Sequence, residues 1–119
     1  MIKSFCKINL SLRVLNKTKK GLHDIQTNTV QLNLYDEILI EKINKKKDII
    51  IFKGRFKKNI SNTNNSVLKT LEILRKKKLI KKHSNKFKIT INKKIPIFSG
   101  LGGGTSNAAF IIKHFVKAR

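Results

Sequence analysis

Apolar and polar residues alternate along several stretches of the chain, as they do in strands that have one buried face. The first such stretch is 8–14, where apolar residues occupy every second position. Similar strand-like patterns recur further along the chain, at 30–34, 37–41, 49–52 and 87–91. Lysine-rich turns follow the first and the third stretch, at 16–21 and 45–48. We therefore expect several short strands and a buried face on the first of them.

Two other stretches have the apolar spacing of a helix. The first stretch is 67–75. Asn65 or Ser66 is its natural N-cap, and the helix should end near Lys78. The second helix is expected over 106–117, with apolar side chains left exposed on it: Phe110, Ile111 and Phe115. Meander-like strands followed by helices favour an α+β fold over a repeating βαβ sheet.

A cluster of glycines lies between the last expected strand and the last expected helix. Four of the six glycines in the chain fall within residues 100–104. A strand, a glycine loop and a helix in this order expose backbone N–H groups at the helix N-terminus, where the helix dipole also favours a phosphate. Glycine is needed because a side chain would block the close approach of the anion. The plainer alternative is a surface loop with a helix cap at Thr105 or Ser106.

The spacing of these glycines excludes the two commonest phosphate loops. A P-loop would need a second glycine five residues after Gly100, followed by lysine, but that position holds Thr105. The dinucleotide-binding fingerprint needs a third glycine three residues after its second. That position holds Thr105 or Asn107, depending on which glycine is counted first.

The chain is strongly basic, with 28 Lys and Arg residues against six Asp and Glu and a net charge of +22. Such a balance suits a polyanionic partner such as RNA or DNA. Most of the charge is lysine, however, accompanied by abundant Asn and Ile, a combination that A- and T-rich codons favour. Nucleic-acid readers interleave lysine with arginine and aromatic residues. We favour compositional drift, and nucleic acid stays an open alternative.

Length and cysteine content narrow the remaining classes. A chain of 119 residues is expected to form one domain, 1–119, with a modest core. The single cysteine, Cys6, excludes an intrachain disulfide and a multi-cysteine metal site. No leader peptide or membrane-spanning run is visible, so we expect a cytoplasmic protein without a membrane partner.

Three segments of the chain resemble motifs of the GHMP kinases, in the same order and at similar spacing. The segment 96–109, from Pro96 to Ala109, is similar to their ATP-binding motif. Residues 6–10, Cys-Lys-Ile-Asn-Leu, resemble an N-terminal Ala-Lys-Leu-Asn-Leu strand. Residues 21–27, Gly-Leu-His-Asp-Ile-Gln-Thr, resemble a Gly-Tyr-His-x-Leu-x-Thr segment. The resemblance implies the N-terminal domain of the GHMP kinase fold, an α+β fold also used by a ribosomal protein.

The resemblance also implies roles for individual residues. Lys7 would orient and polarise the acceptor hydroxyl beside an aspartate, and Asn9 and His23 would contact a cytidyl substrate. Asn65 and Lys93 match positions near the adenine. The residues that would hold ATP are Pro96, Ile97, Phe98, Ser99, Gly100, Leu101, Gly102, Gly103, Gly104, Thr105 and Ser106. Thr105 or Ser106 could also help to bind Mg²⁺.

The implied function is ATP-dependent phosphorylation of a cytidine-diphosphate sugar alcohol, in the non-mevalonate route to isoprenoids. Three positions depart from the family pattern: Leu22 replaces a tyrosine, Ser99 a glycine and Thr105 a serine. The later Gly-Ala-Asp-Val-Pro segment, which carries the catalytic aspartate, does not occur in the chain. We therefore expect an N-terminal fragment of such a kinase, inactive alone. The alternatives are a basic RNA-binding module and a non-catalytic ATP-binding remnant.

Overall fold

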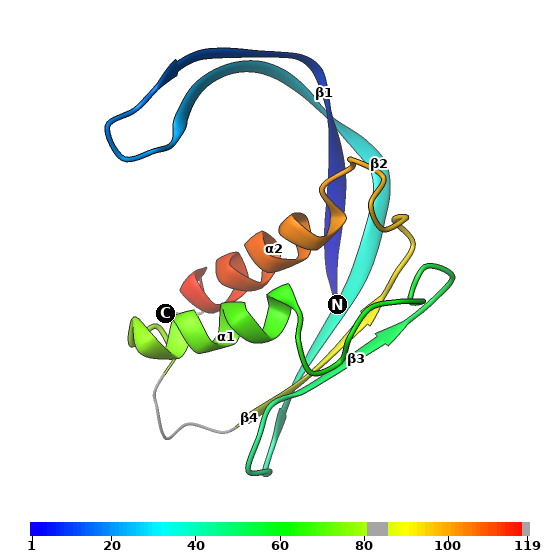
Figure 1. Cartoon of the computed structure of the whole chain (residues 1–119). Coiled ribbons are helices and arrows are strands. Elements are labelled where there is room, and N and C mark those ends of the chain that lie inside the picture. Colours follow the sequence, from blue (N-terminus) through cyan, green and yellow to red (C-terminus); the bar gives the residue numbers. More distant parts are fainter. Residues whose placement is uncertain (81–85, 118–119) are drawn as a thin grey trace.

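A four-stranded sheet and two helices make up the described residues, 1–80 and 86–117, of a computed structural model (Figure 1). In chain order the elements are β1 (Ile2–Lys17), β2 (His23–Ile43), β3 (Ile49–Lys53), α1 (Ser66–Lys76), β4 (Lys86–Asn92) and α2 (Gly103–Lys117). The α+β class is thereby confirmed. The helix predicted after Asn65 is present, with Asn65 as its N-cap, and it ends at Lys76, two residues earlier than expected.

The strands lie in the order β1-β2-β4-β3. The pairs β1–β2 and β2–β4 are antiparallel, whereas β3 runs parallel to β4. A parallel pair cannot be joined by a tight turn, and α1 lies in the connection between β3 and β4. The sheet is therefore mixed, and its last two strands depart from the simple meander.

The stretches 30–34 and 37–41, predicted as two strands, belong to one continuous strand, β2. Their even-numbered residues keep the same alternation through the junction, so that Asp36 and Ile38 lie on the same, buried face. A break would have required a residue that interrupts the ladder, and no glycine or proline occurs in β2. The separation into two strands was wrong for that reason.

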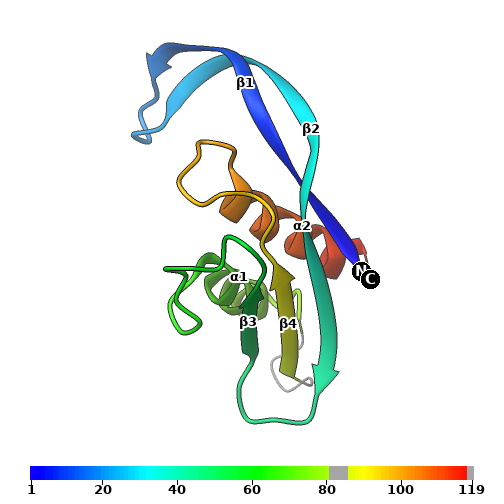
Figure 2. The ribbon, with the colours of Figure 1, turned by 90° about the vertical axis from the view of Figure 1, so that its right-hand side faces the viewer.

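Both helices lie on the same side of the sheet, as Figures 1 and 2 show together. The core between the helices and the sheet is formed by apolar side chains that are almost fully buried: Ile38, Leu71, Leu74, Ile89, Ile91 and Ile111. The expected exposure of Phe110, Ile111 and Phe115 is wrong, because Ile111 is buried and both phenylalanines are partly buried against this core. None of the described helices is long and apolar enough to cross a membrane.

The hairpin of β1 and β2 extends well beyond the helices and then bends over toward the side of the sheet on which they lie (Figure 1). The pairing of its strands is irregular at three places along β1, and such bulges bend a strand pair. The apolar side chains of this arch are mostly exposed, with Leu10 at 65%, Leu12 at 52% and Val14 at 56%. The strand at 8–14 is confirmed, but the buried face expected for it is absent within the described part of the chain.

Candidate functional site

The glycine loop joins β4 to α2 and differs from the expectation in where the helix begins. The helix starts at Gly103, three residues before Ser106, so a cap at Thr105 or Ser106 is wrong. The chain turns at Gly102, whose φ of +68° is a conformation that favours glycine. The first helical hydrogen bond then runs from the Ser106 N–H to the Gly102 carbonyl, at 2.8 Å.

The two helices differ in whether a side chain caps the N-terminus. Asn65 caps α1, because its Oδ1 accepts hydrogen bonds from the N–H groups of Val67 and Leu68, at 3.1 and 3.0 Å. At the start of α2 the equivalent position is Gly102, which has no side chain to offer. Among residues 1–80 and 86–117, no side chain is bonded to the first-turn N–H groups of α2 at 103–105. These donors are left for an anion.

Both helix N-termini open onto one cavity of about 540 Å³. Figure 1 shows α1 and α2 starting at the same end of the molecule, close to the glycine loop. The positive ends of two helix dipoles therefore face the same space, which favours a negatively charged ligand there. Its walls are Phe52, Asn59, Ile60, Ser61, Asn64, Asn65, Ser66, Val67, Lys93, Pro96, Ile97, Phe98, Ser99, Gly100, Gly102, Gly103, Gly104, Thr105 and Asn107.

Most of the residues that the sequence assigned to ATP line this cavity, including Asn65, Lys93 and the loop from Pro96 to Gly100. Leu101 and Ser106 do not line it. The Leu101 carbonyl instead accepts a hydrogen bond from the Lys7 N–H at 3.4 Å. The Ser106 hydroxyl donates to the Phe5 carbonyl. These two residues attach the loop and α2 to β1, which leaves Thr105 as the hydroxyl of the pair that lies at the cavity.

A buried network lies beneath the loop, centred on Asp36. This carboxylate is fully buried and forms an ion pair with Lys93, which is 3% exposed. Its Oδ1 accepts from the N–H groups of Lys94 and Ile95, at 2.7 and 2.9 Å. Its Oδ2 accepts from Asn107 Nδ2 at 3.1 Å. One side chain on β2 thus holds the chain on both sides of the glycine loop.

An exposed ion pair lies next to this network, between Glu37 and Lys94, with 2.6 Å between Oε1 and Nζ. The hydrogen bond from Lys94, helped by one from Asn92, lowers the pKa of the Glu37 carboxyl. The same bond raises the pKa of the Lys94 ammonium. The pair binds the start of the loop to β2 from the solvent side.

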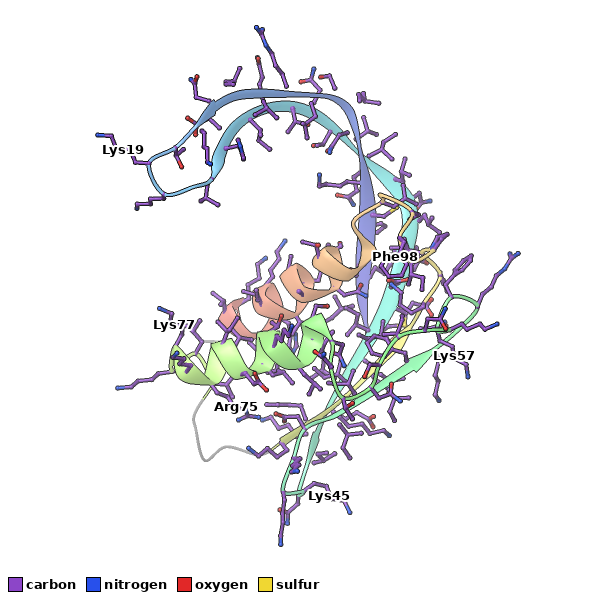
Figure 3. All side chains as sticks on the ribbon, in the orientation of Figure 1. Lys19, Lys45, Lys57, Arg75, Lys77 and Phe98 are labelled. Carbon is purple, nitrogen blue, oxygen red and sulfur yellow. The ribbon has the colours of Figure 1, made fainter. Side chains whose placement is uncertain are left out.

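Lys7 and Asn9 share a face of β1, as expected, since Lys7 Nζ donates to Asn9 Oδ1 at 2.9 Å. The structure does not bring His23 to them. Lys7 pairs with Gln31 in the ladder, whereas His23 pairs with Lys17, ten residues further along β1. Figure 3 shows the hairpin tip, at Lys19, at the far end of the arch.

Sequence reasoning missed Asp36, Asn107 and the opposite wall of the cavity at 59–61. A signal for Asp36 was present, because it occupies a position in phase with the buried Ile38. A carboxylate on a buried face needs a cation and hydrogen-bond donors around it. The wall at 59–61 lies in an irregular loop, where no periodic pattern places a residue.

Lysines contribute to several exposed turns and ends of elements. Figure 3 labels Lys19 at the hairpin tip, Lys45 between β2 and β3, Lys57 after β3 and Lys77 at the end of α1. These four lysines come from four separate segments of the chain. A nucleic-acid surface is expected to gather its cations in a patch or stripe. These four positions do not by themselves form such a patch (Figure 3).

Known proteins resemble the chain over nearly its whole length. The family described as "GHMP kinases N terminal domain" matches residues 65–118. The 4-diphosphocytidyl-2-C-methyl-D-erythritol kinase of Pelagibacter ubique is 43% identical over 118 residues, which are 99% of this chain and 41% of the relative. The enzyme of the same name from Ureaplasma parvum is 40% identical, over 98% of this chain and 43% of the relative.

The fold agrees with a solved structure. A crystal structure of 4-(cytidine 5'-diphospho)-2C-methyl-D-erythritol kinase superposes with a TM-score of 0.64 at 23% identity, over 98% of this chain and 38% of that one. The chain spans about two fifths of the length of these relatives. Its residues 65–118 match the N-terminal domain of the GHMP kinases, and nearly the whole chain is similar to the N-terminal part of the 4-diphosphocytidyl-2-C-methyl-D-erythritol kinases.

Proposed function

We propose that residues 1–119 form the ATP-binding, N-terminal domain of a kinase that phosphorylates 4-diphosphocytidyl-2-C-methyl-D-erythritol at its 2-hydroxyl. The observation that carries the proposal is the uncapped N-terminus of α2, with its free N–H groups at a cavity of about 540 Å³. Phosphates bind at such helix ends because the amides and the dipole act together. The relatives named above carry the same activity in their names.

The walls of the cavity suit the two ends of ATP. Gly102, Gly103 and Gly104 line the cavity without side chains, so their backbone can approach phosphate oxygens closely. The lining also includes apolar side chains, Phe52, Ile60 and Ile97, which suit an aromatic base. Asn65 caps α1 through its Oδ1, so it would contact the adenine while keeping this structural role.

Magnesium would be held mainly by the nucleotide. Mg²⁺ in nucleotide sites is usually bound through one or two carboxylates together with the phosphates. No carboxylate is among the residues lining the cavity, and the described residues hold no group of three His, Cys, Asp or Glu that could bind a metal ion. The Thr105 hydroxyl is the nearest fit that this chain offers. Bound Mg²⁺ would neutralise phosphate charge during transfer.

Lys7 would act on the acceptor side of the reaction. Its backbone is attached to the glycine loop through Leu101, and its exposed ammonium is oriented by Asn9. An ammonium in this place would hold the acceptor hydroxyl and stabilise the charge that develops as it attacks. Asn9 would hydrogen-bond the cytidyl substrate. His23, at the far end of the hairpin ladder, would contact it from the arch.

A chimeric kinase tests this proposal in a full-length context. Residues 1–119 replace the matching part of the Pelagibacter ubique relative, and ATP-dependent phosphorylation of the cytidyl substrate is measured. We expect turnover, and we expect Lys7→Ala to lower kcat at least about a hundredfold with the KM for ATP changed less than about twofold. Lys3→Ala is the matched control, since Lys3 lies on the same strand over the ring of Tyr35.

Two results would contradict the proposal. If the chimera binds ATP without phosphorylating the cytidyl substrate, the substrate assignment is wrong. If Lys7→Ala and Lys3→Ala turn over equally fast, the role given to Lys7 is wrong.

A further inference from the structure

Phe98 is held in an unusual state at the tip of the glycine loop. Its side chain is 99% exposed, and its φ is +57°. Apolar aromatic rings are normally buried, and a bulky residue in the left-handed region is a conformational outlier. Both features raise the free energy of the loop when no ligand is bound. They point to a ligand that contacts the ring.

The other left-handed residues have ordinary explanations. In the described residues, the non-glycine positions with positive φ are Asn59, Lys78 and Phe98. Asparagine tolerates this conformation, and Lys78 follows the C-terminus of α1, where helices commonly end in it. Phe98 has neither reason.

Local hydrogen bonds hold Phe98 at the tip. The Ser99 hydroxyl donates to the Pro96 carbonyl at 2.8 Å and accepts from the Leu101 N–H at 3.4 Å. These bonds join residues on both sides of Phe98, so that the loop is closed around it. The position of Phe98 is therefore set by the loop itself, before any ligand arrives.

The place of the ring is the rim of the cavity at the N-termini of the helices. Phe98 follows Pro96 and Ile97, which form an apolar part of the wall, and precedes Gly100, which begins the glycine-rich part. An aromatic base lying on the apolar wall would present its free face to a ring at this rim. Stacking of a base on an aromatic side chain would cover both surfaces.

We propose that Phe98 stacks on the adenine of ATP bound in this cavity and so contributes to the recognition of the base. The inference rests on the proposed ATP site. The triphosphate is not the partner of the ring, since the face of a phenyl group is electron-rich and repels anions. The phosphates are left to the N–H groups at 103–105, and the base and the phosphates are bound by separate parts of one loop.

Calorimetric titration of the 119-residue chain with ATP and, separately, with inorganic tripolyphosphate tests this inference, with Mg²⁺ present throughout. We expect Phe98→Ala to weaken ATP binding about tenfold. Tripolyphosphate binding should change less than about twofold. Phe98→Tyr, which keeps the ring, should bind ATP like the unsubstituted chain. Ile73→Ala is the control, because Ile73 is also exposed and apolar but lies on α1 outside the cavity lining.

The failure of this inference can be told apart from the failure of the ATP site. If the unsubstituted chain binds both ligands and Phe98→Ala changes ATP affinity by no more than Ile73→Ala does, stacking is refuted and the site stands. Equal weakening of ATP and tripolyphosphate by Phe98→Ala also refutes stacking. If the unsubstituted chain binds neither ligand, the proposed site fails and the inference fails with it.

Discussion

Replacing Asp36 by asparagine is expected to lower the free energy of unfolding by about 3–5 kcal/mol. Asparagine keeps the shape of the side chain but removes the charge that faces Lys93. Lys93 is 3% exposed, so its ammonium would be left buried without a counter-charge. The new amide would also present a donor where Asn107 now finds an acceptor. For a domain stable by roughly 5–15 kcal/mol, such a loss is large.

Urea unfolding followed by circular dichroism measures this effect, and two further variants interpret it. Glu41→Gln makes the same chemical change in the ion pair with Lys88, whose side chains are 44% and 39% exposed, so little change is expected. The double variant Asp36→Asn with Lys93→Met removes both buried charges and should recover part of the loss. Equal stabilities of Asp36→Asn and Glu41→Gln would show that the buried pair does not support the loop.

Replacing Gly104 by valine is expected to weaken ATP binding at least about tenfold while the fold is kept. A Cβ at Gly104 meets no atom within 4 Å, and the residue is helical without a positive φ. The valine side chain would instead occupy part of the cavity, between the phosphates and the first-turn N–H groups. Each charge-assisted hydrogen bond lost there contributes about 1.5–3 kcal/mol, and about 1.4 kcal/mol already corresponds to a tenfold change in affinity.

Gly103→Val is the matched comparison, because it should lower the stability of the fold, which Gly104→Val should leave unchanged. A Cβ at Gly103 would lie 3.0 Å from Ile95 Cγ2 and 3.4 Å from Lys93 Nζ, in the packed region under the loop. Overpacking of this kind costs about 1–3 kcal/mol. Thermal unfolding should thus separate the two variants by stability, and calorimetry should separate them by ATP affinity. Gly104→Val binding ATP like the unsubstituted chain would contradict the phosphate cradle.

Much of the fold was predictable from local signals. The alternation of 87–91, the apolar run 49–52 and the capping asparagine at 65 each identify an element by its own residues. The parallel pairing of β3 with β4 was not predictable, since no short-range pattern indicates which strands become neighbours. The exposed arch of the hairpin was not predictable either. Alternation indicates that a strand could bury one face, and Leu12 shows that this face need not be covered.

Part of the candidate site was likewise predictable from local sequence, and part depends on contacts between distant residues. The glycine cluster marks the phosphate-binding element, because glycine at Gly102 and Gly104 leaves room that any other residue would fill. The role of Lys93 depends on Asp36, which lies 57 residues away in the sequence, so spacing alone could not join them. Ser106 was assigned to the ligand because it lies within the motif. Its side chain turns to β1, a difference that only the three-dimensional arrangement decides.

The most direct test of the ATP site is the response of the glycine amides to ATP in two-dimensional NMR spectra of the ¹⁵N-labelled chain. The six glycines give a small and distinct set of signals, of which Gly21 lies in the hairpin turn and four lie in the loop at 100–104. Addition of ATP with Mg²⁺ should shift the signals of Gly102, Gly103 and Gly104 in a saturable way and leave that of Gly21 unchanged. Unchanged loop signals at saturating ATP, or equal shifts of Gly21 and the loop glycines, would contradict an ATP site at the start of α2.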